Sequence, residues 1–189
     1  MFEKDLIILI IKSNKIINKY SYMKSLYIIR HAKSSWKDLW ISDFDRELNK
    51  RGKDDLEIIW NILKNKKIKL DKIFCSSAKR AELSCSIICK KIWYNFDNVI
   101  FDKNIYDYHM KGIDFYLWYI IEFDNIYNSV ALIWHNDALT ELVEYFLWID
   151  IWKMPTSWVV KINFDIQKWC DISYWNWKKD FYIYPKMYK

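Results

Sequence analysis

Short apolar segments rich in β-branched and aromatic residues alternate with segments of helical periodicity over most of the chain. The first kind is typical of buried strands, and its members are 25–29, 72–75, 99–101, 129–133, 158–164 and the weaker 181–184. The second kind places apolar residues along one helical face, and its members are 49–64, 78–91, 114–122 and 139–146. This alternation predicts an α/β fold of three layers, α/β/α, with a mostly parallel central sheet. Ligand sites are expected at the carboxyl ends of its strands.

The chain of 189 residues fits one domain with a buried core, and no linker rich in Pro, Gly or Ser divides it. Near the start, residues 6–11 form an apolar run that is too short to span a membrane. No cleavage site typical of a signal peptide follows this run. We therefore expect residues 1–22 to be a dispensable extension and residues 23–189 to form the domain.

The charge and the cysteines exclude some classes of function. The net charge of +6 is spread along the chain, so it favours a lysine-rich solvated surface over a nucleic-acid site, which needs clustered basic residues. Attraction of anionic substrates is the second interpretation of this charge. The four cysteines form no CxxC pair and favour buried reduced thiols over a metal site, as in a reducing compartment. We expect a cytoplasmic monomer that binds neither a membrane nor a nucleic acid.

Three predicted strands end in cationic or imidazole side chains. Arg30 and His31 directly follow the strand 25–29, and His135 follows the strand 129–133 after Trp134. Arg80 lies just beyond the strand 72–75. One such residue is ordinarily a solvated surface group, but three neighbouring strand ends of this kind predict a common site for an anion.

Several segments resemble one known family in order and spacing. They are residues 24–36 (KSLYIIRHAKSSW), 42–46 (SDFDR), 48–52 (LNKRG), 76–81 (SSAKRA), 135–136 (HN), 139–142 (LTEL) and 155–157 (PTS). The family is the SixA-type phosphohistidine phosphatases of the histidine phosphatase superfamily. This resemblance implies a phosphoglycerate mutase-like three-layer fold and an enzyme that needs no metal or other cofactor.

The resemblance also implies roles for individual residues. His31 is the expected nucleophile, which accepts the phosphoryl group on a ring nitrogen and so divides one displacement into two easier ones. Arg30, Arg80 and His135 are expected to surround the phosphoryl oxygens, because a guanidinium can bind two oxygens at once. Electrostatic stabilisation of this kind supplies most of the catalysis in phosphoryl transfer.

Other residues of these segments have two interpretations each. Ser34 is either a further donor to the anion or an ordinary loop residue. Asp107 matches a position where family members often carry Glu, so it is a candidate proton donor, although a phosphoramidate leaving group does not require one. The pair Asp43 and Asp45 is expected to orient the loop or cap a helix, and Gly52 to have a structural role. His109 is interpreted as a surface imidazole.

The expected substrate is phosphohistidine in a protein, and the alternative is a small phosphate ester such as a sugar phosphate, since loop shape decides specificity. A pseudoenzyme that binds phosphate without turnover is the third reading, because Trp134 stands where the family usually has Gly and its indole could crowd His135. Trp158 raises a similar doubt, because it stands where the family is expected to have a small residue. A metal hydrolase is least favoured, since His31 and His135 alone are too few ligands for a typical metal site.

The chain contains 12 Trp but only 2 Gly, whereas average usage predicts about 13 Gly in this length. Some of these Trp occupy positions where backbone geometry favours Gly: Trp93 at the end of a predicted helix, Trp134, and Trp175 in a predicted turn at 175–177. One hypothesis is that the source organism reads UGA codons as Gly. The alternative is unusual codon usage in an AT-rich organism.

Overall fold

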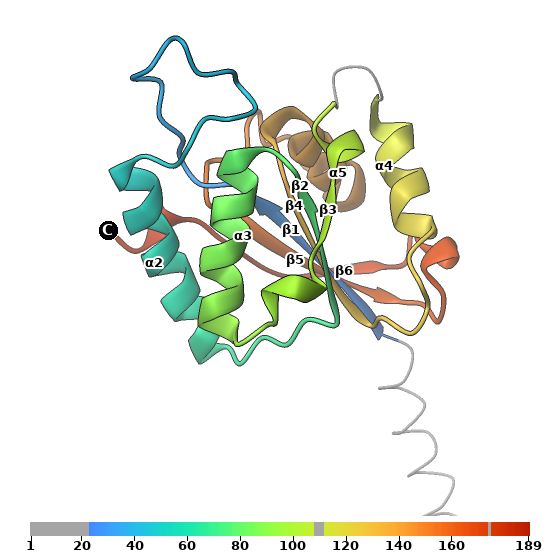
Figure 1. Ribbon diagram of the computed structural model, residues 1–189. Coiled ribbons are helices and arrows are strands. Elements are labelled where there is room, and N and C mark those ends of the chain that lie inside the picture. The colour runs from blue at the N-terminus through green and yellow to red at the C-terminus, as the bar shows by residue number, and fades with distance from the viewer. Residues whose placement is uncertain (1–22, 108–111, 174) are drawn as a thin grey trace, which may run out of the picture.

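The computed structural model describes residues 23–107, 112–173 and 175–189 (Figure 1). A six-stranded sheet forms its centre, with the strand order β3-β2-β4-β1-β5-β6. The strands are β1 (Met23–Arg30), β2 (Lys72–Ser76), β3 (Ile100–Asp102), β4 (Ser129–Trp134), β5 (Val159–Asp165) and β6 (Trp177–Ile183). The strands β3, β2, β4 and β1 pair in parallel, and β5 pairs antiparallel with both β1 and β6. The predicted mostly parallel sheet is confirmed.

Helices cover both faces of this sheet. They are α2 (Lys50–Asn65) and α3 (Lys79–Ile92) on one face, and α4 (Gly112–Ile121) and α5 (Asn136–Leu147) on the other (Figure 1). Side chains of a strand alternate between the faces: Leu26 and Ile28 join the core under α4 and α5, while Tyr27 and Ile29 join the core under α2 and α3. Two apolar cores therefore hold the three layers together, as the α/β/α prediction requires.

The helices begin and end where local chemistry allows it. The Asn49 side chain accepts a hydrogen bond of 2.8 Å from the Gly52 N–H and so caps the start of α2. Each of α3 and α5 ends at a residue in the left-handed conformation, Trp93 (φ 60°) and Trp148 (φ 52°), a position where Gly is the usual residue. The apolar stripe of α2 is buried, as its periodicity predicts.

The sequence-based elements agree with the structure to within about one turn for the helices and two residues for the strands, with one exception. The expected turn at 175–177 is wrong at its last residue, because Trp177 opens β6, which starts four positions before the predicted 181. This edge strand carries a bulge opposite Lys161 and Ile162 and polar residues in its middle, so its alternation is weak.

Two predictions fall outside the described residues: the extension 1–22 and the surface imidazole of His109. None of the helices in the described ranges combines the length and the apolar character needed to cross a bilayer.

The register of the sheet brings distant segments of the chain together. Arg30 of β1 lies beside Trp134 of β4, and Cys75 of β2 lies beside Ile133 of β4. Because these three strands run in the same direction, the residues that follow them meet at one edge of the sheet. This edge carries the candidate site.

Candidate active site

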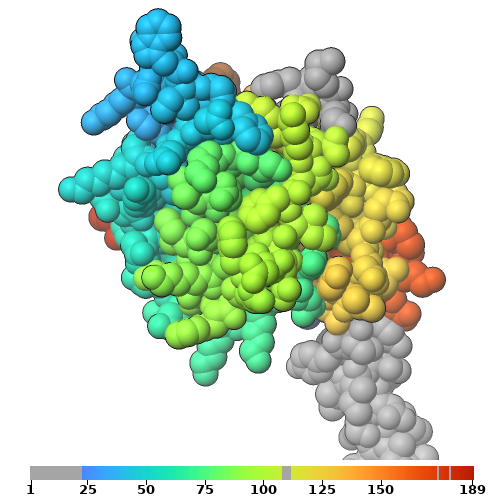
Figure 2. Space-filling view, in the orientation of Figure 1, coloured from blue at the N-terminus to red at the C-terminus, as the bar shows by residue number. Residues whose placement is uncertain are grey.

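A cavity of about 790 Å³ opens at this edge of the sheet. Its wall also includes a long loop between β1 and α2, residues 31–49, whose blue segment stands above the green α3 in Figure 2. All of the predicted site residues line the cavity: Arg30, His31, Ser34, Arg80, Asp107 and His135. The convergence expected from three separate strand ends is therefore present in the fold.

His31 directly follows β1, and its ring is 6% exposed. Its main-chain N–H donates to the carbonyl of Trp134 at 3.0 Å. Its ring Nδ1 lies 2.7 Å from the carbonyl oxygen of Ala32 and donates to it in the neutral tautomer. The lone pair then resides on Nε2, which lies 3.3 Å from Nε of Arg80 on the cavity side. This arrangement leaves Nε2 available as a nucleophile.

The surroundings of His31 keep its ring neutral. Burial is the largest cause, and the neighbouring His135 and Arg80 add to it, so the pKa of His31 lies well below its usual 6.5. A neutral imidazole carries the lone pair that attack on phosphorus requires, and an imidazolium does not. At neutral pH, His31 is thus in its reactive protonation state.

Two arginines flank this ring. Nη1 of Arg30 donates to the carbonyl of Met154, while its buried Nε has no partner among the described residues. Burial lowers the pKa of Arg30 to about 10, so it remains a cation at neutral pH. Arg80, which lies in the first turn of α3 and is 5% exposed, bonds Asp43 at 2.9 Å. An unpaired buried N–H in a cavity wall calls for an acceptor such as a phosphoryl oxygen.

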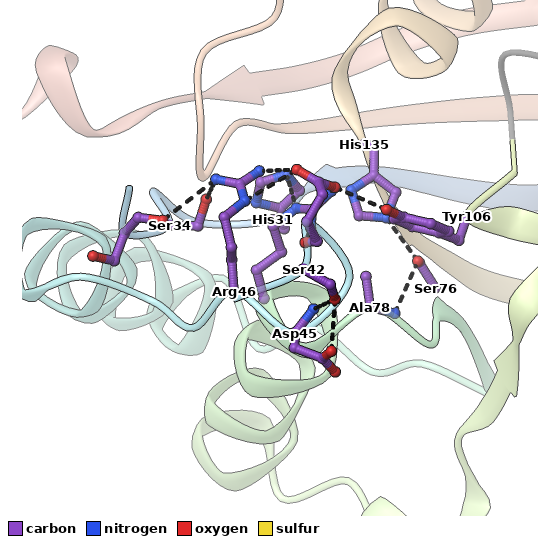
Figure 3. Close-up of polar contacts among 12 residues, drawn as sticks. His31, Ser34, Ser42, Asp45, Arg46, Ser76, Ala78, Tyr106 and His135 are labelled. Carbon is purple, nitrogen blue, oxygen red and sulfur yellow. Dashed lines mark hydrogen bonds and ion pairs between the residues drawn. The ribbon is translucent and has the colours of Figure 1, made fainter. Parts of the chain in front are cut away.

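His135 approaches His31 from the neighbouring strand β4, and the two ring centroids lie 5.0 Å apart (Figure 3). Its Nε2 lies 2.7 Å from Oγ of Ser76, which also accepts a hydrogen bond from the Ala78 N–H. The edge of Tyr106 faces the same ring at 5.6 Å. These contacts fix the orientation of His135 at the start of α5.

The remaining predicted residues lie in the wall of the same cavity. Oγ of Ser34 accepts a hydrogen bond of 2.7 Å from Nη1 of Arg46, and Asp107 is exposed. Asp43 bonds Arg46 and Arg80, which agrees with its expected role in orienting the loop, whereas Asp45 bonds only Ser42 within the loop. The structure therefore places Asp43, but not Asp45, at the cavity.

Gly52 is required by a close approach of two main-chain segments. A Cβ at this position would lie 2.2 Å from the carbonyl oxygen of Lys33 and 2.9 Å from its nitrogen. Real side chains do not tolerate such contacts, so only Gly lets the start of α2 lie against the segment that follows His31. The structural role expected for Gly52 agrees with this geometry.

The expectation that Trp134 could crowd His135 is wrong. The Trp134 side chain is fully buried on the α4 side of the sheet, where it packs on Tyr116 and Tyr119, and it does not line the cavity. Trp158 likewise packs away from the cavity, against Tyr182 and Tyr184. The argument for a pseudoenzyme from Trp134 therefore loses its basis.

Sequence reasoning did not assign three further residues of this site: Ser76, Arg46 and Tyr106. Ser76 stands at a strand end and Arg46 within a matched segment, so their positions carried a signal. Tyr106 directly follows the short 3-10 helix Lys103–Ile105, and no periodicity marks it. Within the described part of the chain, no group of three or more His, Cys, Asp or Glu is placed to hold a metal ion.

Residues 26–111 match the family model of the histidine phosphatase superfamily (branch 1). This segment belongs to that superfamily. The match confirms the family expected from the motifs and the expected enzyme class, a phosphatase with a histidine nucleophile. A comparison with functionally curated proteins gives no match.

Several solved structures share the fold of this chain. A protein from Agrobacterium tumefaciens assigned as the phosphohistidine phosphatase SixA is 23% identical, with a TM-score of 0.70, and the match covers 86% of this chain and 99% of that one. The protein histidine phosphatase SixA complexed with tungstate is 18% identical, with a TM-score of 0.72 and coverages of 87% and 99%. A mycobacterial glucosyl-3-phosphoglycerate phosphatase is 12% identical, with a TM-score of 0.58 and coverages of 86% and 99%. The predicted phosphoglycerate mutase-like fold is confirmed.

Proposed function

We propose that the protein hydrolyses phosphohistidine on another protein, with His31 as the nucleophile. The observation that carries the proposal is the position of His31 Nε2 in an open cavity, 3.3 Å from a cationic nitrogen of Arg80. Arg30 and His135 line the same cavity. A neutral imidazole whose Nε2 faces the cavity, with positive groups around it, is the arrangement that phosphoryl transfer needs.

In the first step, Nε2 of His31 attacks phosphorus. The P–Nε2 bond forms while the P–N bond of the donor breaks, and the donor imidazole leaves with a proton that it already carries or takes from water. The hydrogen bond from Nδ1 to the Ala32 carbonyl supports the positive charge that develops on the His31 ring.

Arg30, Arg80 and His135 act on the phosphoryl group itself. The two guanidinium groups donate to its oxygens and neutralise charge that spreads over them in the transition state. His135 donates through the nitrogen that faces the phosphoryl group, while its contacts with Ser76 and Tyr106 keep the ring from turning. Ser34 and Asp107 stay predictions as an additional donor and a proton source.

In the second step, water attacks the phosphorus of phospho-His31. The P–Nε2 bond breaks, inorganic phosphate leaves, and the neutral ring is restored because its pKa is depressed by burial. No step requires a metal ion or another cofactor.

Two features favour a phosphohistidine substrate over a small ester. Asp107 and residues of the loop 31–49 line the cavity, and Asp107 is exposed, so a side chain carried by another protein can approach the cavity from solvent. The phosphoramidate bond also lowers the demand for a strong acid, and the one candidate acid predicted from the sequence, Asp107, is solvated.

The test is transfer of label from a ³²P-phosphohistidine protein, followed by quenching in alkali, where phosphohistidine survives. Wild type should carry label on His31, and His31→Asn should carry none. The matched control is Glu57→Gln, which removes only a surface ion pair with Lys91. Equal labelling of His31→Asn and wild type would remove His31 from this role.

The substrate class is tested by comparing kcat/KM for the phosphohistidine protein with kcat/KM for a panel of sugar phosphates. We expect the protein substrate to be preferred at least about tenfold, a difference of 1.4 kcal/mol in transition-state binding. A reversed preference would replace the protein substrate by a small phosphomonoester while leaving the nucleophile in place.

A further inference from the structure

Asp43 contacts two arginines and a tyrosine of the site. Its Oδ2 accepts hydrogen bonds from Nη2 of Arg80 and from the hydroxyl of Tyr106, both at 2.9 Å. Its Oδ1 accepts from Nε of Arg46 at 3.0 Å, and its main-chain carbonyl accepts from Nη1 of Arg80 at 2.5 Å. One loop residue thus holds two guanidinium groups and a phenol.

These hydrogen bonds hold the guanidinium of Arg80 in one orientation. Both terminal nitrogens of its guanidinium are tied to Asp43, and the third nitrogen, Nε, is thereby directed to Nε2 of His31 at 3.3 Å. A free arginine side chain loses rotamer entropy when it is fixed. Fixing it in the resting enzyme removes that cost from the reaction, which is how preorganised charges accelerate a step.

Tyr106 contacts both Asp43 and His135. Its hydroxyl donates to Asp43, and its ring lies nearly perpendicular to that of His135, with centroids 5.6 Å apart (Figure 3). The ring of Phe44 packs against Tyr106, with centroids 5.0 Å apart. The same side chain therefore touches the residue that orients Arg80 and the imidazole that faces His31. Burial and the Asp43 carboxylate raise the pKa of Tyr106, so its hydroxyl keeps the proton that it donates.

We propose that Asp43 is a positioning residue that sets Arg80 against the transferring phosphoryl group, and that Tyr106 holds Asp43 in place. This inference rests on the proposed phosphatase activity. Asp43 does not touch phosphorus, because its carboxylate is paired with Arg46 and Arg80 and an unpaired carboxylate would repel the substrate. A merely structural Asp43 would tie the loop 31–49 to the domain without affecting Arg80.

The experiment is a double-mutant cycle between Asp43 and Arg80, assayed with an aryl phosphate on the full chain. Asp43→Ala alone should lower kcat at least about tenfold with a smaller change in KM, and Tyr106→Phe about threefold. In the Arg80→Ala background, Asp43→Ala should have no further effect, because it acts through Arg80. Asp45→Asn, in the same loop but bonded only to Ser42, is the control and should equal wild type.

Two results would overturn the proposal: an equal loss of kcat from Asp43→Ala in both backgrounds, or unchanged kinetics in the folded variant. If wild type has no phosphatase activity, the proposed function fails, but the positioning remains measurable by calorimetry with tungstate. Asp43→Ala should then weaken tungstate binding at least about tenfold in the wild-type background and not in the Arg80→Ala background. Equal weakening of tungstate binding in both backgrounds would contradict the positioning role of Asp43.

A second, independent inference concerns the tryptophans. Trp93, Trp148 and Trp152 have φ angles of 60°, 52° and 50°, in the left-handed region that favours Gly. Two of them end helices α3 and α5, where Gly is the most frequent residue. Their side chains are 88%, 72% and 92% exposed, whereas Trp is normally well buried.

Several other tryptophans also lie in environments that are unusual for an indole. Trp40 and Trp175 are 98% and 76% exposed in loops. Trp60, Trp134 and Trp158 are buried, but their indole N–H groups have no partner among the described residues, an unusual state for a buried indole. Trp169 alone is both fully buried and bonded through its Nε1, to the Tyr127 carbonyl at 2.9 Å.

We infer that the protein made in its own organism carries Gly at positions 93, 148 and 152, through a genetic code that reads UGA as Gly. Peptide mass spectrometry of the protein from its source tests this directly, because the mass of each peptide distinguishes the two residues. We expect Gly at all three positions. Trp at any of them would overturn the inference.

Discussion

Replacing the three left-handed tryptophans by Gly should stabilise the protein, although such substitutions remove the largest side chain. The variant is Trp93→Gly, Trp148→Gly and Trp152→Gly, made together. Each side chain is at least 72% exposed, so little apolar burial is lost. Each backbone already has a φ between 50° and 60°, which Gly adopts without strain.

The magnitude follows from two opposing contributions. A residue with a Cβ costs about 1–2 kcal/mol in the left-handed region. Gly offsets about 0.5–1 kcal/mol of this gain, because its unfolded chain has more conformational freedom. The net gain is about 0.5–1 kcal/mol per position, or about 2 kcal/mol for the three. For a domain of this size, this corresponds to a rise in Tm of about 4–8 °C.

The assay is thermal and urea unfolding followed by circular dichroism, with Trp60→Gly as the opposite control. Trp60 is 1% exposed and has no positive φ, so its replacement should cost at least about 3–5 kcal/mol. A triple variant with an unchanged or lower Tm would refute the reasoning, because it would show that the left-handed backbone imposes no cost on Trp.

Three further predictions concern the site. Because the pKa of His31 is depressed in the fold, the unfolded chain binds a proton near pH 6.5 that the folded chain excludes; the free energy of unfolding is therefore lower at pH 5.5 than at pH 6.5. His31→Gln should flatten this dependence in urea titrations at both pH values, and an equal slope in the variant would contradict the assignment. Gly52→Ala should lower the free energy of unfolding by about 1–3 kcal/mol and reduce kcat, since its Cβ would meet the main chain of Lys33; a variant as stable and active as wild type would show that this approach is not needed. Excess chelator should leave hydrolysis of an aryl phosphate unchanged, and a loss that a divalent cation restores would point to a metal-dependent reaction.

Much of the fold was predictable because its strands are buried on both faces and therefore read as short apolar runs. The strand beginning near Ser25 and the one beginning at Ser129 were placed from such runs, and both are confirmed. The edge strand β6 begins four residues before the predicted 181, because the polar residues Lys178 to Asp180 in its middle interrupt the apolar alternation.

The site was predictable to the extent that it depends on strand ends. Arg30, His31, Arg80 and His135 follow parallel strands, and a parallel sheet gathers its carboxyl ends at one edge. Contacts made by a loop side chain have no such rule. The bond between Asp43 and Arg80 joins residues 37 positions apart, and nothing in the spacing of either predicts which loop conformation brings them together.

The alternation of side chains along a strand explains why Trp134 does not crowd His135. Successive residues of a strand point to opposite faces of the sheet, so Trp134 shares a face with Val130 and Leu132, and both lie in the core under α4 and α5. The family's preference for Gly before the second histidine was interpreted as a need for space at the phosphate pocket. The alternation instead directs the indole into that core, where its centroid lies 3.9 Å from that of Tyr116, closer than aromatic pairs normally approach. A Gly at this position would therefore relieve crowding between the sheet and α4 and leave the phosphate pocket as it is.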